Sequence, residues 1–340
     1  MTIPISPQQA QGTNPNQQVI RQAPVSDKST MLQWVQNLEN ARNGNRVIVY
    51  WVSSTARISE AVALSLYDQL VSIGKQPAID LVLFTYGGDI EIPLRIVNLV
   101  REFCDKFSVL IPYSAYSAGT LLAMGADEIV MTPLGVLGPI DPTRTHPLLP
   151  TRAGAQQAEP ISVQDMRHAM KFITETAAPS GNHIYTPEAM AQIVIALFDK
   201  IHPLAIGAIE QSYALAKLIG IKCLSTHMDS IQEKDKIERI VNTLCDDYKS
   251  HSFQISRKEA KDIGLKVVDA NIAEDVALMN ILKFYTTRNI TIPTNPIAGQ
   301  NFKTNIAWLD SISMQMHCEA DMKKEQNGQI IPLSDKWLLY

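Results

Sequence analysis

The sequence predicts an α/β fold with a mostly parallel sheet. Three observations carry this prediction: short apolar runs rich in β-branched residues, segments of helical periodicity between them, and connections long enough to cross back over a sheet. The apolar runs lie at 47–53, 79–86, 107–114 and 128–133. Strands that alternate with helices at such spacings form right-handed βαβ units, so we expect these runs to be neighbouring parallel strands.

Helices are expected wherever apolar residues recur at intervals of three or four. This pattern covers 31–43, 58–74, 90–104 and 118–127 among the strands, and then 204–224 and 230–249. Capping residues mark two further helix starts, because a side-chain oxygen can accept a free N–H of the first turn. These are Thr186, which is followed by Pro187, and Ser256, which stands three residues before Glu259.

The chain divides into three parts by composition. Residues 1–28 are rich in Gln, Asn, Pro and Ser and predict a disordered arm. Residues 29–290 form the main domain, with a helical insertion over about 150–245. The remainder, 291–340, contains several prolines and one stretch of helical pattern near 304–325, and it predicts a helical C-terminal extension.

Bulk properties exclude several classes of function. The chain has 340 residues and a net charge of −4, without a basic stripe, so nucleic-acid binding is not expected. Four scattered cysteines favour reduced thiols. Neither a signal peptide nor a membrane span is expected, since the longest apolar run has ten residues. We therefore expect a cytoplasmic protein.

The residues that point to chemistry gather at the ends of two expected strands. Gly87 and Gly88 follow one strand, and Ser117 follows the next strand and opens a helix. Ligands of open α/β sheets bind beyond the carboxyl ends of the strands, so these residues are expected to share one crevice. Adjacent glycines and the first N–H of a helix, here that of Ala118, can both donate to an oxyanion. Ser117 is therefore a candidate nucleophile, although a helix-start serine is more often only a cap.

These motifs together resemble those of the serine dehydrogenase proteinase family, which is related to the Clp protease proteolytic subunit and to signal peptide peptidase A. The resemblance covers 45–142 and, less closely, 240–270. Its matching elements are Gly-Gly at 87–88, Ala-x-Ser-Ala-Gly-Thr around Ser117, Gly-Ala-Asp at 125–127, Gly-Pro-Ile-Asp-Pro at 138–142, and SHSFQISRKEAKDIGL at 250–265. It implies Clp/crotonase-like repeated β-β-α units, peptidase activity and assembly into trimers, hexamers or rings.

A serine nucleophile needs a base, and the sequence leaves its identity open. The resemblance would place a histidine near Ile140, which cannot serve, and His146 lies six residues further on. It also places His251 beside Ser117 in space, and an imidazole is suited to accept a proton near neutral pH. Ser252 stands where the family tends to have aspartate.

Lys171 is the second candidate base. Enzymes similar to signal peptide peptidase pair serine with a downstream lysine, which must be desolvated to act as a base. Asp89 and Asp141 flank the expected crevice and can orient a base, bind substrate or fix a turn.

The sequence thus favours a serine peptidase that acts through a Ser117 acyl-enzyme. Gly87, Gly88 and Ala118 would form its oxyanion hole, and its substrate would be a peptide or protein. The alternatives are a non-catalytic oligomeric scaffold with the same fold and a crotonase-like acyl-thioester enzyme. No metal or organic cofactor is implied, because no metal-spaced His/Cys cluster and no phosphate loop is present. A homo-oligomer is expected, partly because 203–224 is apolar over much of its circumference.

Overall fold

The structure is a computed structural model that describes residues 28–144, 148, 161–162, 166, 168–169, 171, 186–199, 201–287, 298–326 and 330–339. The arm expected at 1–28 lies outside these residues except for Lys28, and His146 lies outside them as well.

An eight-stranded sheet forms the centre of the described chain, in the order β10-β5-β3-β2-β1-β11-β12-β13. Its first five strands run parallel; the sequence predicts four of them, and β10 is the fifth. They are β1 (Arg46–Val52), β2 (Gln76–Phe84), β3 (Cys104–Ile111), β5 (Glu128–Met131) and β10 (Val267–Asp269).

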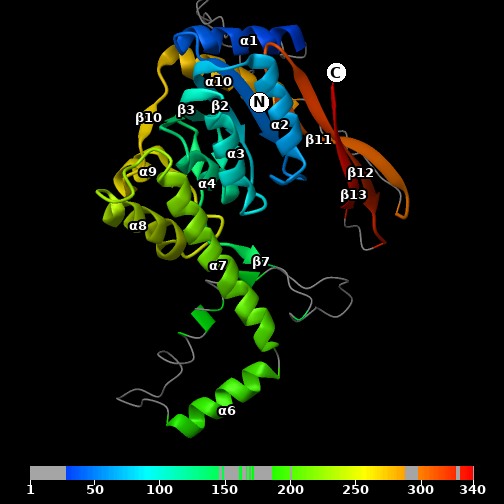
Figure 1. Cartoon of the computed structure of the whole chain (residues 1–340). Helices are drawn as coiled ribbons and strands as arrows, with labels where there is room; N and C mark the ends of the chain where they lie inside the picture. Colours follow the sequence, from blue (N-terminus) through cyan, green and yellow to red (C-terminus); the bar gives the residue numbers. More distant parts are fainter. Residues whose placement is uncertain are drawn as a thin grey trace, which may run out of the picture.

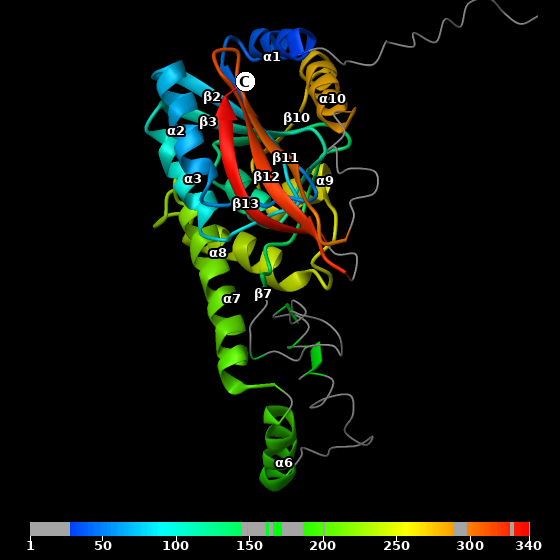
Figure 2. The ribbon, with the colours of Figure 1, turned by 90° about the vertical axis from the view of Figure 1, so that its right-hand side faces the viewer.

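Helices cover both faces of the parallel part, which makes a three-layer α/β/α domain. On one side lie α2 (Val62–Ile73), α3 (Ile92–Arg101) and α4 (Ala118–Met124), and on the other lie α1 (Lys28–Ala41) and α10 (Ile272–Thr287). Figure 2 shows α2 and α3 on one side of the sheet and α10 on the other.

The β1 sequence explains this double covering. Its side chains alternate between the two faces, as they must in a strand. Ile48, Tyr50 and Val52 belong to the core under α2, α3 and α4. Val47, Val49 and Trp51 belong to the core under α1 and α10. An uninterrupted apolar run is therefore what a strand buried on both faces requires.

The prediction of a helical C-terminal extension is wrong. Residues 301–339 instead form three long strands: β11 (Asn301–Asp310), β12 (Gln315–Lys324) and β13 (Ile330–Leu339). They are antiparallel, and β11 joins the sheet by pairing with β1. β12 shows why the pattern was misread: it alternates buried and half-buried side chains, a strand period that its charged residues conceal.

The remaining helices lie beyond the carboxyl ends of the parallel strands. They are α6 (Pro187–Phe198), α7 (Pro203–Leu224), α8 (Lys234–Asn242), a π-helical turn (Thr243–Asp247) and α9 (Arg257–Ile263). The helix starts expected at Thr186 and Ser256 are confirmed, because each side chain accepts an N–H of its first turn. Figure 1 shows α7 running from the body of the molecule toward α6 at its far end.

Among the described helices, α7 alone is long and apolar enough to cross a bilayer by length and composition. Of the qualifying stretch, 39% is buried inside the structure, and the core helix of a folded domain passes the same test.

Short strands complete the surroundings of the site. A three-stranded sheet joins β4 (Ser114–Ala115), β6 (Val136–Leu137) and β9 (Ile255–Ser256), and a separate pair joins β7 (Thr143–Arg144) and β8 (Ile161–Ser162). The first of these sheets brings residues near 115 and 255 together.

Candidate active site

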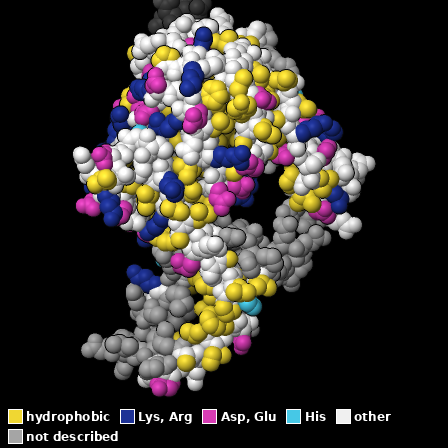
Figure 3. All heavy atoms as spheres, in the orientation of Figure 1, with side chains coloured by type: hydrophobic (Ala, Val, Ile, Leu, Met, Phe, Trp, Pro, Cys, Tyr) yellow, Lys and Arg dark blue, Asp and Glu magenta, His cyan; other side chains and the backbone are white. Residues whose placement is uncertain are grey.

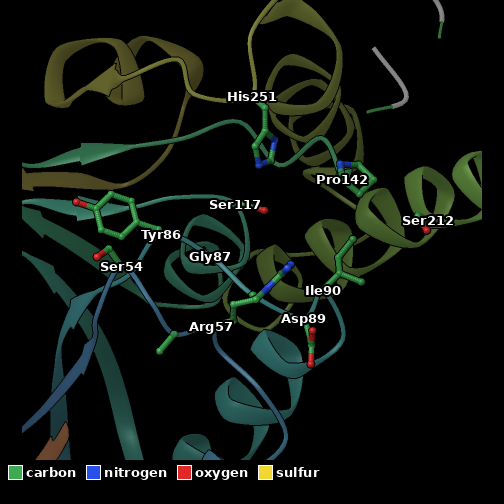
Figure 4. Close-up of a pocket in the computed structure, with 12 residues that line it drawn as sticks. Ser54, Arg57, Tyr86, Gly87, Asp89, Ile90, Ser117, Pro142, Ser212 and His251 are labelled. Carbon is green, nitrogen blue, oxygen red and sulfur yellow. The ribbon is translucent and has the colours of Figure 1, made fainter. Parts of the chain in front are cut away.

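A cavity of about 440 Å³ lies beyond the carboxyl ends of β1 and β2, as expected for this fold. Loops that follow different strands contribute to its wall, and Figure 4 shows the side chains that border it. The lining residues are Ser54, Ala56, Arg57, Tyr86, Gly87, Gly88, Asp89, Ile90, Ser117, Pro142, Ser212 and His251.

Ser117 occupies a sharp turn between β4 and α4. Its backbone has φ 50° and ψ −109°, a conformation that is costly for a residue with a side chain. Small neighbours allow the turn. A Cβ on Gly119 would lie 2.4 Å from Thr85 Cγ2, so α4 can pack this closely only with glycine there. The turn presents a half-buried Ser117 at the cavity wall, as a nucleophile requires.

The double-glycine loop runs directly beside Ser117. Gly87 has φ +114°, and a Cβ on it would lie 3.1 Å from Ser117 Cβ. The Gly87 N–H donates to Thr85 Oγ1 at 3.0 Å, which leaves it unavailable to a substrate. Gly88 pairs with Ile58 in a parallel bridge. In this bridge the Ile58 N–H donates to Gly87 O and the Asp89 N–H donates to Ile58 O, so the Gly88 N–H is not used.

Two N–H groups therefore remain as oxyanion donors, those of Gly88 and Ala118. Neither donates to an acceptor within the described part of the chain. The sequence predicts Gly87 as a third donor, but its N–H is already hydrogen-bonded to Thr85. Gly87 instead allows the loop to adopt a positive φ.

His251 and Asp141 form a hydrogen-bonded pair at the same cavity. The His251 Nδ1 lies 3.0 Å from Asp141 Oδ1. The Asp141 side chain is 2% exposed, whereas that of His251 is 35% exposed. An ionised carboxylate can only accept, so Nδ1 carries the proton and Nε2 keeps its lone pair. In Figure 4 the His251 ring points from its loop toward the side of the cavity where Ser117 lies.

The chain fixes both partners firmly. The Ile140 N–H donates to Leu244 O at 3.0 Å, which ties the Asp141 loop to the turn that precedes His251. Thr120 Oγ1 lies 2.8 Å from both Ala115 O and Gly138 O and accepts the Gly138 N–H at 3.1 Å, which ties the same loop to the Ser117 turn. Hydrogen bonds thus hold these three separate segments together.

Asp141 changes the acidity of His251. The hydrogen bond to Asp141 raises the pKa of His251 above its usual value, while burial acts in the opposite direction. A neutral His251 is therefore available only above that raised pKa.

The other candidates are placed differently. Lys171 is exposed and does not belong to the cavity lining given above. Asp89 lines the cavity from the glycine loop and is exposed. His146 lies outside the described residues.

Sequence reasoning missed Arg57 and did not pair Asp141 with His251. Arg57 follows β1 just as Gly87 follows β2, so its position at a strand's carboxyl end was a usable signal. The pairing carried no local signal, since 110 positions separate the two residues.

Comparisons with known proteins find one protein family and several individual proteins that are similar to this chain. Residues 63–180 match the family described as ClpP-like SDH-type serine proteinases. Two uncharacterized proteins of Methanocaldococcus jannaschii are also similar. The first is 24% identical over 210 residues, which are 62% of this chain and 60% of the relative. The second is 42% identical over 64 residues, which are 19% of this chain and 22% of the relative. The chain therefore spans less than two thirds of either relative's length.

Among solved structures, a mutant of the 1510-N membrane-bound stomatin-specific protease is similar at 18% identity and a TM-score of 0.35, covering 69% of this chain and 84% of that one. The catalytic domain of the ClpP protease from Plasmodium falciparum is similar at 12% identity and a TM-score of 0.35, covering 72% of this chain and 93% of that one. The family match includes the glycine loop, Ser117 and Asp141. Over residues 63–180, the chain is therefore similar to the ClpP-like SDH-type serine proteinases.

Proposed function

We propose that the protein is a serine peptidase in which Ser117, His251 and Asp141 act as a catalytic triad. The observation that carries the proposal is the 3.0 Å hydrogen bond between a buried carboxylate and a histidine that shares a cavity with Ser117. A base oriented by a third group is the arrangement that activates a serine hydroxyl.

The reaction follows from these positions. His251 Nε2 takes the proton of Ser117 Oγ as the oxygen attacks the peptide carbonyl. The oxyanion then accepts hydrogen bonds from the N–H groups of Gly88 and Ala118. His251 next gives its proton to the leaving amine, which leaves an acyl group on Ser117. A water molecule, deprotonated by His251, hydrolyses this ester and restores the enzyme.

The structure contains no hydrogen bond between Ser117 and His251 within its described residues. Catalytic hydrogen bonds are often long before substrate binds, so this geometry is compatible with the proposal.

The Asp141–His251 pair also favours a peptidase over the two alternatives, a non-catalytic scaffold and an acyl-thioester enzyme. A non-catalytic scaffold has no use for a strained serine facing an oriented histidine, because the strain costs of order 1–3 kcal/mol. An acyl-thioester enzyme would use the same two N–H donors but would not need Ser117 as a nucleophile. The triad therefore favours the peptidase over both.

We further propose that copies of the chain associate through α6 and the adjoining half of α7. Figure 3 shows hydrophobic side chains gathered along this projection. Ile195 is 62% exposed, Phe198 45% and Leu204 67%. Apolar surface of this kind, concentrated on one projecting segment, is typical of interaction sites.

Peptide hydrolysis tests the proposed activity. The full chain is incubated with casein and with a mixed peptide library, and new termini are identified by mass spectrometry. Cleavage is expected from the wild type and should be absent from Ser117→Ala. Ser54→Ala is the matched control because Ser54 lines the same cavity. Equal cleavage by wild type and Ser117→Ala would contradict the proposal.

A further inference from the structure

Arg57 places an unpaired positive charge in the wall of the proposed catalytic cavity. Its side chain is exposed at that wall. Within the described part of the chain, it has neither a hydrogen bond nor an ion pair. Five other described arginines pair with carboxylates, whereas Arg239, which has no such partner, lies outside the cavity lining; the five are Arg42, Arg46, Arg95, Arg101 and Arg257. A cation left free at a reacting centre is available to a ligand.

The backbone on both sides of Arg57 is fixed. The Ala56 N–H donates to Ser53 O at 3.0 Å, and the Ile58 N–H donates to Gly87 O at 2.9 Å. Ile58 itself is completely buried. Successive side chains of an extended segment point in opposite directions, so Arg57 faces away from the core when Ile58 faces into it.

The contact between Ile58 and Gly88 also places Arg57 close to Gly88, whose N–H is a proposed oxyanion donor. A Cβ on Gly88 would lie 2.2 Å from Ile58 O, so the two backbones are in the closest possible contact. Arg57 is therefore one residue from a segment that is packed directly against Gly88. In Figure 4 its side chain reaches into the space that Ser117 and His251 also border.

The charges around the cavity agree with this placement. The bond to Asp141 is the main cause that raises the pKa of His251, and the charge of Arg57 acts against that rise. The guanidinium is thus close enough to influence the base. Asp89 is the other charged residue of the lining, and it is exposed without an ion pair to Arg57.

We propose that Arg57 is a specificity-determining residue that binds a carboxylate of the peptide substrate beside the scissile bond. This inference rests on the proposed peptidase function. A guanidinium presents a planar fork that matches a carboxylate, and a charged hydrogen bond of this kind is stronger than a neutral one. The carboxylate can come from an Asp or Glu side chain or from the C-terminus of the peptide.

Matched peptides test the preference and separate its two sources. One pair differs only by Glu or Gln next to the cleaved bond, and a second pair differs only by a free or amidated C-terminus. The wild type is expected to favour the carboxylate member of one pair by about tenfold or more in kcat/KM. The pair that shows the preference identifies the source, and no preference in either pair overturns the inference.

Substitution assigns the preference to Arg57. In Arg57→Met the ratio between the paired peptides should fall to about one, chiefly through KM, since a ground-state contact is removed. Arg57→Lys should retain part of the ratio because the charge remains. Arg95→Met is the control: Arg95 is an exposed arginine that pairs with Glu60 outside the cavity lining, and its loss should leave the ratio unchanged.

A binding measurement keeps this inference separate from the proposed activity. Fluorescence anisotropy of labelled peptides on Ser117→Ala reports affinity without turnover. Tighter binding of the carboxylate peptide, lost in Ser117→Ala with Arg57→Met, supports Arg57 even if the wild type cleaves nothing. A ratio that survives Arg57→Met contradicts the assignment, whether or not Ser117 proves to be the nucleophile.

Discussion

At the scale of single residues, the proposed triad depends on the contact between the Asp141 carboxylate and His251. One carboxylate oxygen accepts from His251 Nδ1 at 3.0 Å, and the other is buried without a hydrogen-bond partner among the described residues. Among the described residues, His251 is therefore the only hydrogen-bond partner of the Asp141 carboxylate. Such a bond fixes the tautomer and the orientation of the ring.

Asp141→Asn should reduce peptide cleavage by about four orders of magnitude, because the amide favours the wrong tautomer of His251. The reduction should appear in kcat, with an unchanged circular dichroism spectrum. Asp89→Asn provides the comparison, since Asp89 is an exposed carboxylate at the same cavity without a bond to His251. A similar loss in both variants would mean that Asp141 has no specific role.

The pH dependence of Ser117 acylation should follow His251. The base must be neutral, and Asp141 raises its pKa above the usual value of 6.5. The rate of modification by a fluorophosphonate should therefore rise with pH through a midpoint above 6.5. In Asp141→Asn the remaining rate should have its midpoint at lower pH, because the raising interaction is gone. A flat profile between pH 5 and 9 would exclude His251.

At the scale of secondary-structure elements, a buried charge cluster joins α1 to the sheet at the end opposite the cavity. Arg42 contacts Asp80 at 2.7 Å, Glu128 at 2.6 Å and Glu274 at 3.1 Å. Its side chain is 10% exposed. Burial alone would raise the pKa of Glu128, but hydrogen bonds from Arg42 and Lys106 bring it below its usual range.

Arg42→Ala should destabilise the fold by about 3–5 kcal/mol, because it leaves buried carboxylates without a counter-charge. The free energy of unfolding is measured in urea. Glu128 has a lowered pKa in the folded state, so its contribution is present above its unfolded pKa and is lost as the pH falls through the folded value. Arg95→Ala removes only an exposed pair and should cost about 0–1 kcal/mol. Equal costs for the two variants would contradict this account.

The C-terminal strands should be required for a soluble fold. β11 covers the edge of β1, and removal of residues 299–340 would expose that edge and the apolar side chains of β1. We expect this truncation to aggregate. Removal of 327–340 deletes only the edge strand β13 and should leave a soluble protein, as judged by size-exclusion chromatography. A soluble, monodisperse 1–298 fragment would show that the extension is dispensable.

These elements also show where sequence reasoning succeeds and fails. The central parallel strands could be predicted because each contains a mostly apolar run, as burial on both faces demands. β11 and β12 could not, because one face is only half buried and carries charged residues such as Lys303 and Glu319. Ser117 and Gly88 were identifiable from local motifs, whereas the Asp141–His251 contact depends on how distant segments pack.

At the scale of the whole molecule, the projection made of α6 and the start of α7 extends away from the sheet (Figure 1). Removing apolar side chains from water is favourable, so burying those of the projection against a partner surface would stabilise an assembly. This is the basis for proposing that copies of the chain meet there.

Ile195→Glu combined with Leu204→Glu should lower the molar mass measured by light scattering, because buried carboxylates oppose association. Ile231→Glu is the matched control, since Ile231 is 87% exposed on a turn outside the projection. An assembly that is unaffected by the double substitution would place the interface elsewhere.

The central claim is that Ser117 is a nucleophile activated by His251, and mapping of a fluorophosphonate adduct tests it most directly. After digestion, mass spectrometry should find the adduct on Ser117 in the wild type and in Lys171→Ala, and should find none in His251→Ala. An adduct confined to another serine, or undiminished labelling of Ser117 in His251→Ala, would contradict the claim.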